Sequence, residues 1–290
     1  MTKEYYSLGL MSGSSLDGLD ICYSKICISD EVYSFEILQA ETYPYSSDLI
    51  CDLELCRSFS EEKLNSLHIQ LGSIFGNLCL NFSSKHKIEY LDFISSHGHT
   101  VFHYPERGIT LQIGSGQTIA NITKIKTISN LRQKDIDLGG SGAPIVPIGD
   151  LLFFLDDIYC LNLGGIMNIS KKWNNSIISY DIGSCNQILN YYASQKGLLY
   201  DKDGILASSG HFHLDLFEAL KKLDYYKAVY PKSLDNGFSK TVIELINQFQ
   251  NLSIEDILHT YNHHIAWLIS ENTDQTHSIL LSGGGTHNAF

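Results

Sequence analysis

The chain has 290 residues, 43% of them hydrophobic, which is enough for one large domain or two medium-sized domains. Its formal net charge of −12 argues against nucleic acid and anionic membrane surfaces as partners and favours a soluble, cytoplasmic protein. The seven cysteines are odd in number and form no Cys-x-x-Cys pair, so neither a disulfide framework nor a zinc framework is indicated. No run approaches the roughly 18 apolar residues of a membrane span, and the N-terminus lacks a signal peptide's features.

A glycine-rich stretch, Gly9–Asp20, joins two predicted strands at Tyr5–Leu10 and Ile21–Ile28. Glycines let a backbone approach an anion closely, serine hydroxyls donate to it, and Asp17 or Asp20 could hold a metal ion. The pattern of a Walker-type loop is absent. A phosphate-binding turn is therefore one interpretation, and an ordinary hairpin turn remains the other, because turns favour the same residues.

A third strand is predicted at Val32–Gln39, followed by a long helix. Ser58 and Glu61 have the spacing of a capping box, and apolar residues recur every three or four positions from Leu64 to Phe82. This periodicity indicates a helix with one buried face, so we assign it to packing rather than chemistry.

A short apolar strand, Leu91–Ile94, is expected to end in the polar stretch Ser95–His103, where open α/β sheets place their ligands. Its three histidines, His97, His99 and His103, could ligate a metal, but a polar substrate wall or packed histidines are favoured. Another strand, beginning at Thr110, ends in a glycine turn.

The segment Asn130–Pro144 combines a charged cluster with Gly-Gly-Ser-Gly. Glycine loses the most backbone freedom on folding, so this segment is costly to order unless something binds there. A mobile surface loop is the alternative. Arg132 is the notable residue, because its planar guanidinium suits a carboxylate or a phosphate.

The second half repeats the opening pattern. Strands at Ile158–Leu163 and Ile166–Ser170 flank Gly164-Gly165, and a strand at Ile177–Tyr180 is followed by Asp181 and a helix at Gln187–Ser194. A carboxylate at a strand end, beside a glycine and ahead of a helix, can act as a general base or a metal ligand. We therefore interpret Asp181 as functional.

The remainder is predicted to be mostly helical. Helices are expected at Leu214–Leu223, at Lys240–Gln250 and from Ile254 onward, the last capped by Ser253 and Asp256. Three histidines on that last helix, His259, His263 and His264, are interpreted as structural. A final strand, Ser278–Leu281, leads into the glycines Gly283, Gly284 and Gly285.

Two halves, each opening with an antiparallel strand pair around a glycine turn, predict a duplicated α/β fold with mixed sheets and a cleft between two lobes. The expected lobes are residues 1–126 and 127–290. This plan resembles the sugar kinase, Hsp70 and actin superfamily, whose domains are ribonuclease H-like. Within it, the chain resembles the anhydro-N-acetylmuramic acid kinases. The motifs that carry the resemblance are Gly9–Asp20, Ser96–His103, Thr110–Gly114, Gly139–Pro147, Asn162–Ile169 and Ser282–Asn288.

The resemblance implies a reaction in which ATP, water and 1,6-anhydro-N-acetylmuramic acid give N-acetylmuramic acid 6-phosphate and ADP during recycling of cell-wall peptidoglycan. It implies Asp181 as the catalytic base and ATP with Mg²⁺ as cofactors, the metal ligand being Asp20. The implied nucleotide-binding residues are Gly13, Ser14, Ser15, Leu16, Asp17, Gly18, Leu19, Asp20, Gly164, Gly165, Gly283, Gly284, Gly285 and Asn288. The implied sugar-binding residues are His97, His99, Thr100, Arg132 and Asn186.

The chain also departs from the family pattern. The usual Asp-Phe-Arg is Asn130-Leu131-Arg132, so the arginine lacks an acidic neighbour, and a usual Gln is His99. Family members continue past the last glycine motif through a segment with a further glutamate, so a strand edge and an apolar face are expected to be uncovered. These departures motivate an alternative, a catalytically impaired sugar- or nucleotide-binding homologue. A homodimer is left open.

Overall fold

The computed structural model describes residues 2–13, 16–104, 107–154, 158–173, 176–230, 232–234, 237–274 and 276–290. The chain forms two compact units, residues 1–153 and residues 154–290. The division therefore falls after Phe153, whereas the sequence placed it after residue 126. The segment between these positions joins the first unit because Thr127–Ile128 pair with a strand there and the two following helices pack on strands of the same sheet.

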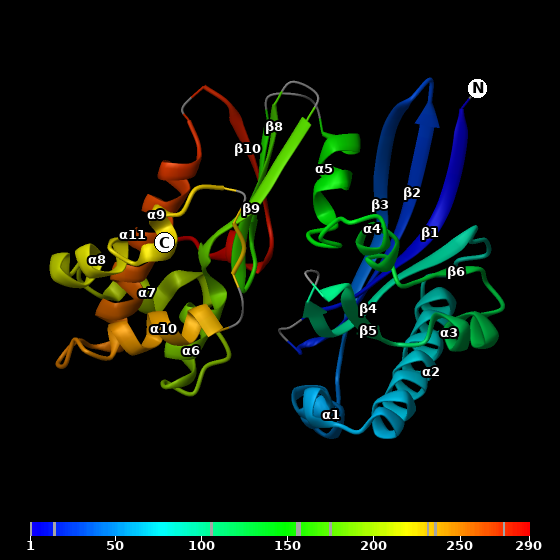
Figure 1. Cartoon of the computed structure of the whole chain (residues 1–290), viewed down its shortest axis with the longest axis horizontal. Helices are drawn as coiled ribbons and strands as arrows, with labels where there is room; N and C mark the ends of the chain where they lie inside the picture. Colours follow the sequence, from blue (N-terminus) through cyan, green and yellow to red (C-terminus); the bar gives the residue numbers. More distant parts are fainter. Residues whose placement is uncertain are drawn as a thin grey trace. The chain divides into compact units, whose positions relative to one another are not determined.

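The first unit is built on a mixed sheet with the strand order β3-β2-β1-β4-β5, and β6 also pairs with β4 (Figure 1). Short connections make β1, β2 and β3 an antiparallel meander, while β4 lies parallel to β1. The strands are β1 (Lys3–Ser12), β2 (Gly18–Ser29), β3 (Val32–Pro44), β4 (Phe93–Tyr104), β5 (Ile109–Ile113) and β6 (Thr127–Ile128).

The long predicted helix is α2, and its apolar face builds the first core. Leu71 and Phe75 of α2 are fully buried in the same cluster as Leu8 of β1. The helix is capped by Ser60, whose Oγ accepts from the Lys63 N–H, so the predicted cap at Ser58 is wrong. Ser58 belongs to the preceding turn. The helical elements are α1 (Ser47–Leu55), η1 (Cys56–Ser58), α2 (Glu61–Lys85), α3 (Gly116–Thr123), α4 (Gln133–Asp137) and α5 (Val146–Phe153).

Strand β4 is much longer than the predicted strand Leu91–Ile94. The polar stretch that was expected to follow the strand is part of it, and β4 ends only at Tyr104. The physical reason is that β1 and β5 flank this stretch and supply backbone hydrogen bonds whatever the side chains are. His97 and His99 are therefore held on a strand.

The second unit repeats the plan of the first. Its sheet has the order β10-β7-β8-β9, in which β7, β8 and β9 form an antiparallel meander and β10 lies parallel to β7. The strands are β7 (Ile158–Leu163), β8 (Ile166–Trp173), β9 (Ser176–Ser184) and β10 (Ser278–Ser282). In each unit, the first strand of the meander thus has a parallel neighbour from later in the chain, β4 beside β1 and β10 beside β7. The predicted duplication of an α/β unit with mixed sheets is confirmed.

Helices of the second unit pack on its sheet around a separate core. Ile182 of β9, Leu189 of α6 and Tyr261 of α11 are buried together there. The helical elements are α6 (Asn186–Ser194), η3 (Lys202–Gly204), α7 (Ile205–Ser209), α8 (Leu214–Lys221), α9 (Asp224–Lys227), α10 (Gly237–Ile246), α11 (Ile254–Asn272) and η4 (Gly284–His287).

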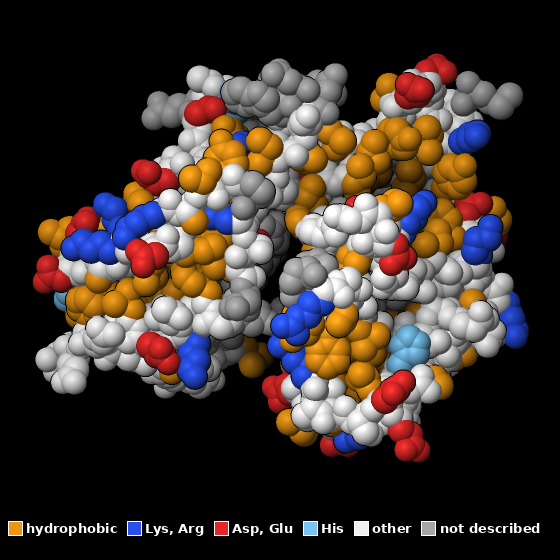
Figure 2. Space-filling view, viewed as in Figure 1, with side chains coloured by type: hydrophobic (Ala, Val, Ile, Leu, Met, Phe, Trp, Pro, Cys, Tyr) orange, Lys and Arg blue, Asp and Glu red, His pale blue; other side chains and the backbone are white. Residues whose placement is uncertain are grey.

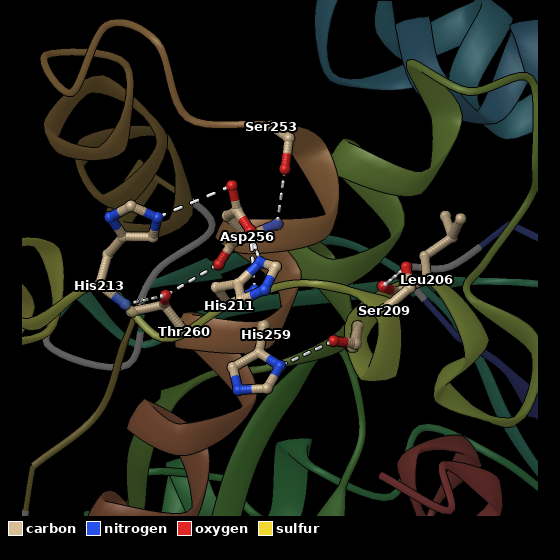
Figure 3. Close-up of polar contacts among 9 residues, drawn as sticks. Leu206, Ser209, His211, His213, Ser253, Asp256, His259 and Thr260 are labelled. Atoms are coloured by element: carbon tan, nitrogen blue, oxygen red, sulfur yellow. Dashed lines mark hydrogen bonds and ion pairs between the residues drawn. The ribbon is translucent and has the colours of Figure 1, made fainter.

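The predicted cap of α11 is confirmed. The Asp256 N–H donates to Ser253 Oγ at 3.0 Å, and the Asp256 carboxylate accepts from the backbone N–H of His211 at 2.7 Å (Figure 3). Hydrogen bonds from Ser253 and His211 lower the pKa of Asp256 to about 2. His259 shares a hydrogen bond of 2.9 Å with the Ala207 carbonyl, which supports its structural interpretation.

Apolar side chains are exposed on β3 and on β10. On β3, Val32 and Ile37 are more than half exposed, and hydrophobic side chains gather over this end of the sheet (Figure 2). On β10, every residue is exposed. Among the described residues, none of the helices has the length and apolar character needed to cross a membrane.

His264 of α11 should make the second unit sensitive to acid. Its side chain is 0% exposed, neither ring nitrogen has a described hydrogen-bond partner, and burial lowers its pKa from 6.5 to about 3. Between these two pKa values, His264 therefore binds a proton in the unfolded chain but stays neutral in the folded chain. The stability is fully present above pH 6.5 and falls as the pH drops toward 3, by at most about 1.4 kcal/mol per pH unit.

We expect His264→Phe to weaken this pH dependence, because the aromatic ring fits the same packing and takes up no proton. Urea unfolding at pH 7 and pH 5 measures it. His287→Gln is the control, since the His287 side chain is exposed. An unchanged difference between the two pH values in His264→Phe would contradict the assignment.

Candidate functional site

The predicted phosphate turn lies between β1 and β2 of the first unit. Gly13 and Leu16 bracket it, and the Leu16 N–H donates to the Gly13 carbonyl at 3.4 Å. Ser14 and Ser15 lie outside the described residues. Leu19 is fully buried in the core, so only its backbone is available to a ligand. The second strand of the hairpin is thus held in place by the burial of Leu19 in the core.

Gly18 is required by a close approach of two strands. A Cβ at this position would overlap the carbonyl oxygen of Tyr43 on β3. We expect Gly18→Ala to separate β2 from β3 and to cost about 1–3 kcal/mol of stability, as overpacking does. Thermal unfolding measures this cost.

Gly9→Ala in the same hairpin is the control for Gly18→Ala. A Cβ added at Gly9 would lie 3.9 Å from the Cys22 carbonyl oxygen, which is an ordinary van der Waals contact. We expect this variant to unfold near the parent temperature. Equal losses in both variants would show that the strand approach at Gly18 is not the cause.

A buried hydrogen-bond chain supports the start of the turn. Tyr45 OH donates to Ser12 Oγ at 2.7 Å, and Ser12 Oγ lies 3.2 Å from His99 Nδ1. Burial lowers the pKa of His99 to about 4, so the ring is neutral at pH 7. His99 lines neither of the cavities described below, and neither does Thr100, whose buried hydroxyl has no partner.

Asp20 faces a cavity of about 290 Å³ on the first sheet. Its carboxylate accepts from the Thr42 hydroxyl of β3 at 2.5 Å. One exposed carboxylate suits Mg²⁺, which commonly binds through one or two carboxylates together with substrate phosphates. The cavity is lined by Gly9, Leu10, Met11, Asp20, Cys22, Ser95, His97 and Leu131.

His97 and Arg132 form a pair at 2.8 Å between Nε2 and Nη2. A guanidinium can only donate, so His97 Nε2 accepts, and its Nδ1–H donates to the Gly98 carbonyl at 2.9 Å. Both contacts fix a neutral ring, and burial lowers the pKa of His97. Among the described residues, Arg132 Nε is buried without a hydrogen-bond partner, and no carboxylate is paired with Arg132. The arginine is thus oriented by a histidine and keeps its charge uncompensated.

A second cavity of about 460 Å³ shares His97 with the first. The residues that line it include Ser96 and Gln112, which have no predicted role. Each has one buried polar atom without a described hydrogen-bond partner, Ser96 Oγ and Gln112 Oε1. The available signal was Gln112 itself, a polar residue inside the apolar strand of the Thr110–Gly114 motif.

The three histidines of β4 have separate partners. His97 pairs with Arg132, His99 with Ser12, and His103 with Thr110. In the described part of the chain, no group of three or more His, Cys, Asp or Glu side chains is placed to hold a metal ion. The alternative of a histidine metal site on this strand is wrong for the described residues.

Asp181 of the second unit lies inside β9, at a register shift of the β8–β9 ladder, rather than after the strand. Such irregularities are frequent near active sites. Its Oδ2 accepts from the Leu234 N–H at 2.8 Å, and its backbone carbonyl accepts from Tyr225 OH at 2.7 Å. Burial raises the pKa of the Asp181 carboxyl. A carboxylate with a raised pKa is chemically suited to take a proton.

The end of β7, which leads into the second glycine turn, lies against the glycine motif that begins at Gly283. A Cβ at Gly283, which has φ +86°, would come within 2.8 Å of the Leu163 carbonyl, and one at Gly285 within 2.7 Å of Leu163 Cβ. Only glycine therefore allows this motif to approach the end of β7 so closely.

Asn186 joins these elements. Its Nδ2 donates to the Leu163 carbonyl at 2.9 Å, and its backbone N–H donates to the Gly164 carbonyl at 3.1 Å. Its side chain thus holds the glycine turn. Asn288 lies farther along the motif, where its Nδ2 donates to Asn262 Oδ1 of α11 at 3.1 Å.

Comparison with known proteins decides the family. The family model of anhydro-N-acetylmuramic acid kinase matches residues 4–290. The chain belongs to the anhydro-N-acetylmuramic acid kinase family. The family member from Pseudoalteromonas translucida is 33% identical over 314 residues, which cover 97% of this chain and 78% of that protein. The one from Francisella tularensis subsp. novicida is 33% identical over 320 residues, covering 100% and 83%.

Similarity to solved structures is weaker. The activator of the 2-hydroxyisocaproyl-CoA dehydratase from Clostridium difficile, with bound ADPNP, aligns with a TM-score of 0.38 and 13% identity, covering 100% of this chain and 82% of that chain. The assignment of this kinase family member therefore depends on the sequence match.

Proposed function

We propose that this chain is an ATP-dependent kinase that hydrolytically opens 1,6-anhydro-N-acetylmuramic acid and phosphorylates it to N-acetylmuramic acid 6-phosphate in peptidoglycan recycling. The observation that carries the proposal is the family match over residues 4–290. The buried carboxyl of Asp181, with its raised pKa, supports it chemically. Since ATP is a cytoplasmic metabolite, we also propose a cytoplasmic location.

The reaction requires one base and an aligned phosphate. Asp181 would take a proton from a water molecule as that water attacks the anomeric carbon. The bond from that carbon to the sixth oxygen breaks, and the freed oxygen attacks the γ-phosphorus, so ADP leaves. Phosphoryl transfer needs mainly positioning and charge neutralisation, which the protein supplies through backbone amides and cations.

The phosphate groups would bind at the hairpin from Gly13 to Asp20 and at Gly164-Gly165. Asp20 would be the protein ligand of Mg²⁺, which neutralises phosphate charge when bound. The adenosine would lie at Gly283, Gly284, Gly285 and Asn288. Asn186 would act by holding the glycine turns that its side chain joins.

Arg132 would bind the lactyl carboxylate of the sugar. Its unpartnered Nε and uncompensated charge favour an anionic acceptor, because a buried donor without a partner costs about 1–3 kcal/mol. His97 would position the guanidinium through its fixed Nε2 acceptor.

Oxygen labelling tests the proposal. The purified chain is incubated with ATP, Mg²⁺ and the anhydro-sugar in H₂¹⁸O, and ADP release is coupled to a dye. We expect ADP only with the sugar present, and ¹⁸O on the anomeric hydroxyl but not in the phosphate. Labelled inorganic phosphate would indicate simple ATP hydrolysis, and binding without ADP would indicate an impaired homologue.

A further inference from the structure

A short segment, Lys232–Leu234, lies along the outer edge of β9. Strand β9 is the last strand in the order β10-β7-β8-β9, and no strand of the described residues flanks its outer edge. The Asp181 N–H donates to the Lys232 carbonyl at 3.1 Å. The segment therefore pairs with β9 at the residue that is proposed as the base.

Leu234 of the same segment binds the Asp181 side chain. Its N–H donates to Asp181 Oδ2 at 2.8 Å. Among the described residues, no hydrogen bond reaches the other carboxylate oxygen, Oδ1. The direction of a backbone N–H is fixed by the main chain, so this contact sets the orientation of the carboxylate and leaves Oδ1 to take a proton.

Tyr225 holds the backbone of Asp181. The Tyr225 hydroxyl donates to the Asp181 carbonyl at 2.7 Å. Lys232 connects Tyr225 to the segment, because its Nζ donates to the Tyr225 carbonyl at 3.2 Å and lies 4.6 Å from the centre of the Tyr225 ring. The N–H, the carbonyl and the carboxylate of Asp181 are thus all held by residues between positions 225 and 234.

We propose that Leu234 and Tyr225 are positioning residues for Asp181: the Leu234 N–H orients its carboxylate, and the Tyr225 hydroxyl fixes its backbone. This inference rests on the proposed function, because it states how the base of that reaction is held. A misplacement of about 1 Å can reduce turnover about 10²-fold, so contacts made only to the base can control the rate.

The hydrogen bond from Leu234 also acts on the charge of Asp181. Burial raises the pKa of this carboxyl, and the Leu234 hydrogen bond lowers it, because the bond stabilises the ionised form. Removal of the bond should therefore raise the pKa further. A residue that only supported the fold would leave the pKa where it is.

Leu234→Pro removes the N–H, and Leu234→Ala is the matched control because it keeps the N–H. A carbon-13 NMR titration of the aspartate carboxyl groups measures the Asp181 pKa, and the Asp181 signal is the one missing from Asp181→Asn. We expect a pKa about one pH unit higher in Leu234→Pro and an unchanged pKa in Leu234→Ala. This measurement needs no turnover.

Turnover measures the positioning itself. In Leu234→Pro, kcat should fall by up to about 100-fold. The KM values for the sugar and for ATP should stay, since the residues proposed to bind them are unaltered. In Asp181→Asn, the same proline should cause no further loss, because the base that it would position is already absent. An equal loss in both backgrounds would show that Leu234 acts elsewhere and would overturn its role.

Tyr225→Phe tests the second contact without changing the main chain. We expect kcat to fall about two- to tenfold, the usual worth of one hydrogen bond. Tyr226→Phe is the matched control, since the Tyr226 hydroxyl is buried and has no described hydrogen-bond partner. It should keep its turnover. The same kcat in both variants would overturn the role of Tyr225.

The inference and the proposed function can fail separately. An unaltered protein that releases no ADP refutes the activity, whereas a higher Asp181 pKa in Leu234→Pro alone still supports the contact by which Leu234 holds the carboxylate. A protein that releases ADP, while Leu234→Pro keeps both the pKa and the kcat of the unaltered chain, supports the activity and refutes the role of Leu234.

Discussion

Replacing Asp181 by Asn should reduce turnover of the anhydro-sugar about 10²–10⁴-fold, the usual contribution of a general base. The amide cannot take the proton of the attacking water. It can still accept from the Leu234 N–H through its oxygen, so the local structure should be kept. ADP release at saturating ATP and sugar measures the loss, and calorimetry should show unchanged ATP affinity.

Asp256→Asn is the matched control for this variant. Its carboxylate also accepts from a backbone N–H, at 2.7 Å from His211, but at the start of α11 (Figure 3). We expect it to lower stability without lowering turnover. Comparable losses of turnover in the two variants would mean that Asp181 acts by holding the fold.

The pH profile gives a second test of Asp181. A base works only when unprotonated, so turnover should fall as the pH drops through its pKa. Burial raises that pKa, so the acid limb should lie above the range of an ordinary aspartate. The residual turnover of Asp181→Asn should no longer fall in this pH range. A limb that persists in the variant would assign the titration to another group.

The repeated strand pairs could be predicted from sequence because their pattern is local. Strand β7 begins and ends at Ile158 and Leu163 as predicted, since this mostly apolar run is preceded by two aspartates and followed by two glycines. Strand β4 could not be delimited in the same way. Its polar half is held by hydrogen bonds from β5, which follows it directly, and from β1, which lies far away in the sequence.

Individual residues of the candidate site could be proposed from the sequence, but the contacts between them could not. Asp181 and Arg132 were singled out by residue type and neighbours. The bond from Arg132 to His97 joins positions 35 residues apart, so no local pattern contains it.

Replacing Arg132 by Met should raise the KM for the anhydro-sugar about 10–100-fold, because a charge-assisted hydrogen bond is worth about 1.5–3 kcal/mol. The analogue without the lactyl group should bind the variant and the unaltered protein alike. The KM of Arg132→Lys should lie between those of the unaltered protein and Arg132→Met, since lysine keeps the charge but lacks the planar guanidinium. Initial rates over a range of sugar concentrations, at saturating ATP, give the comparison.

The same variant should be at least as stable as the unaltered protein. Arg132 is a partly buried cation whose pKa is lowered by burial, and no described carboxylate compensates it. A buried charge without an opposite partner costs free energy, so an apolar side chain of similar length should relieve that cost. A higher KM together with an equal or higher unfolding temperature identifies a residue retained for its ligand. A lower unfolding temperature would instead identify Arg132 as a support of the fold, and its assignment to the sugar carboxylate would be lost.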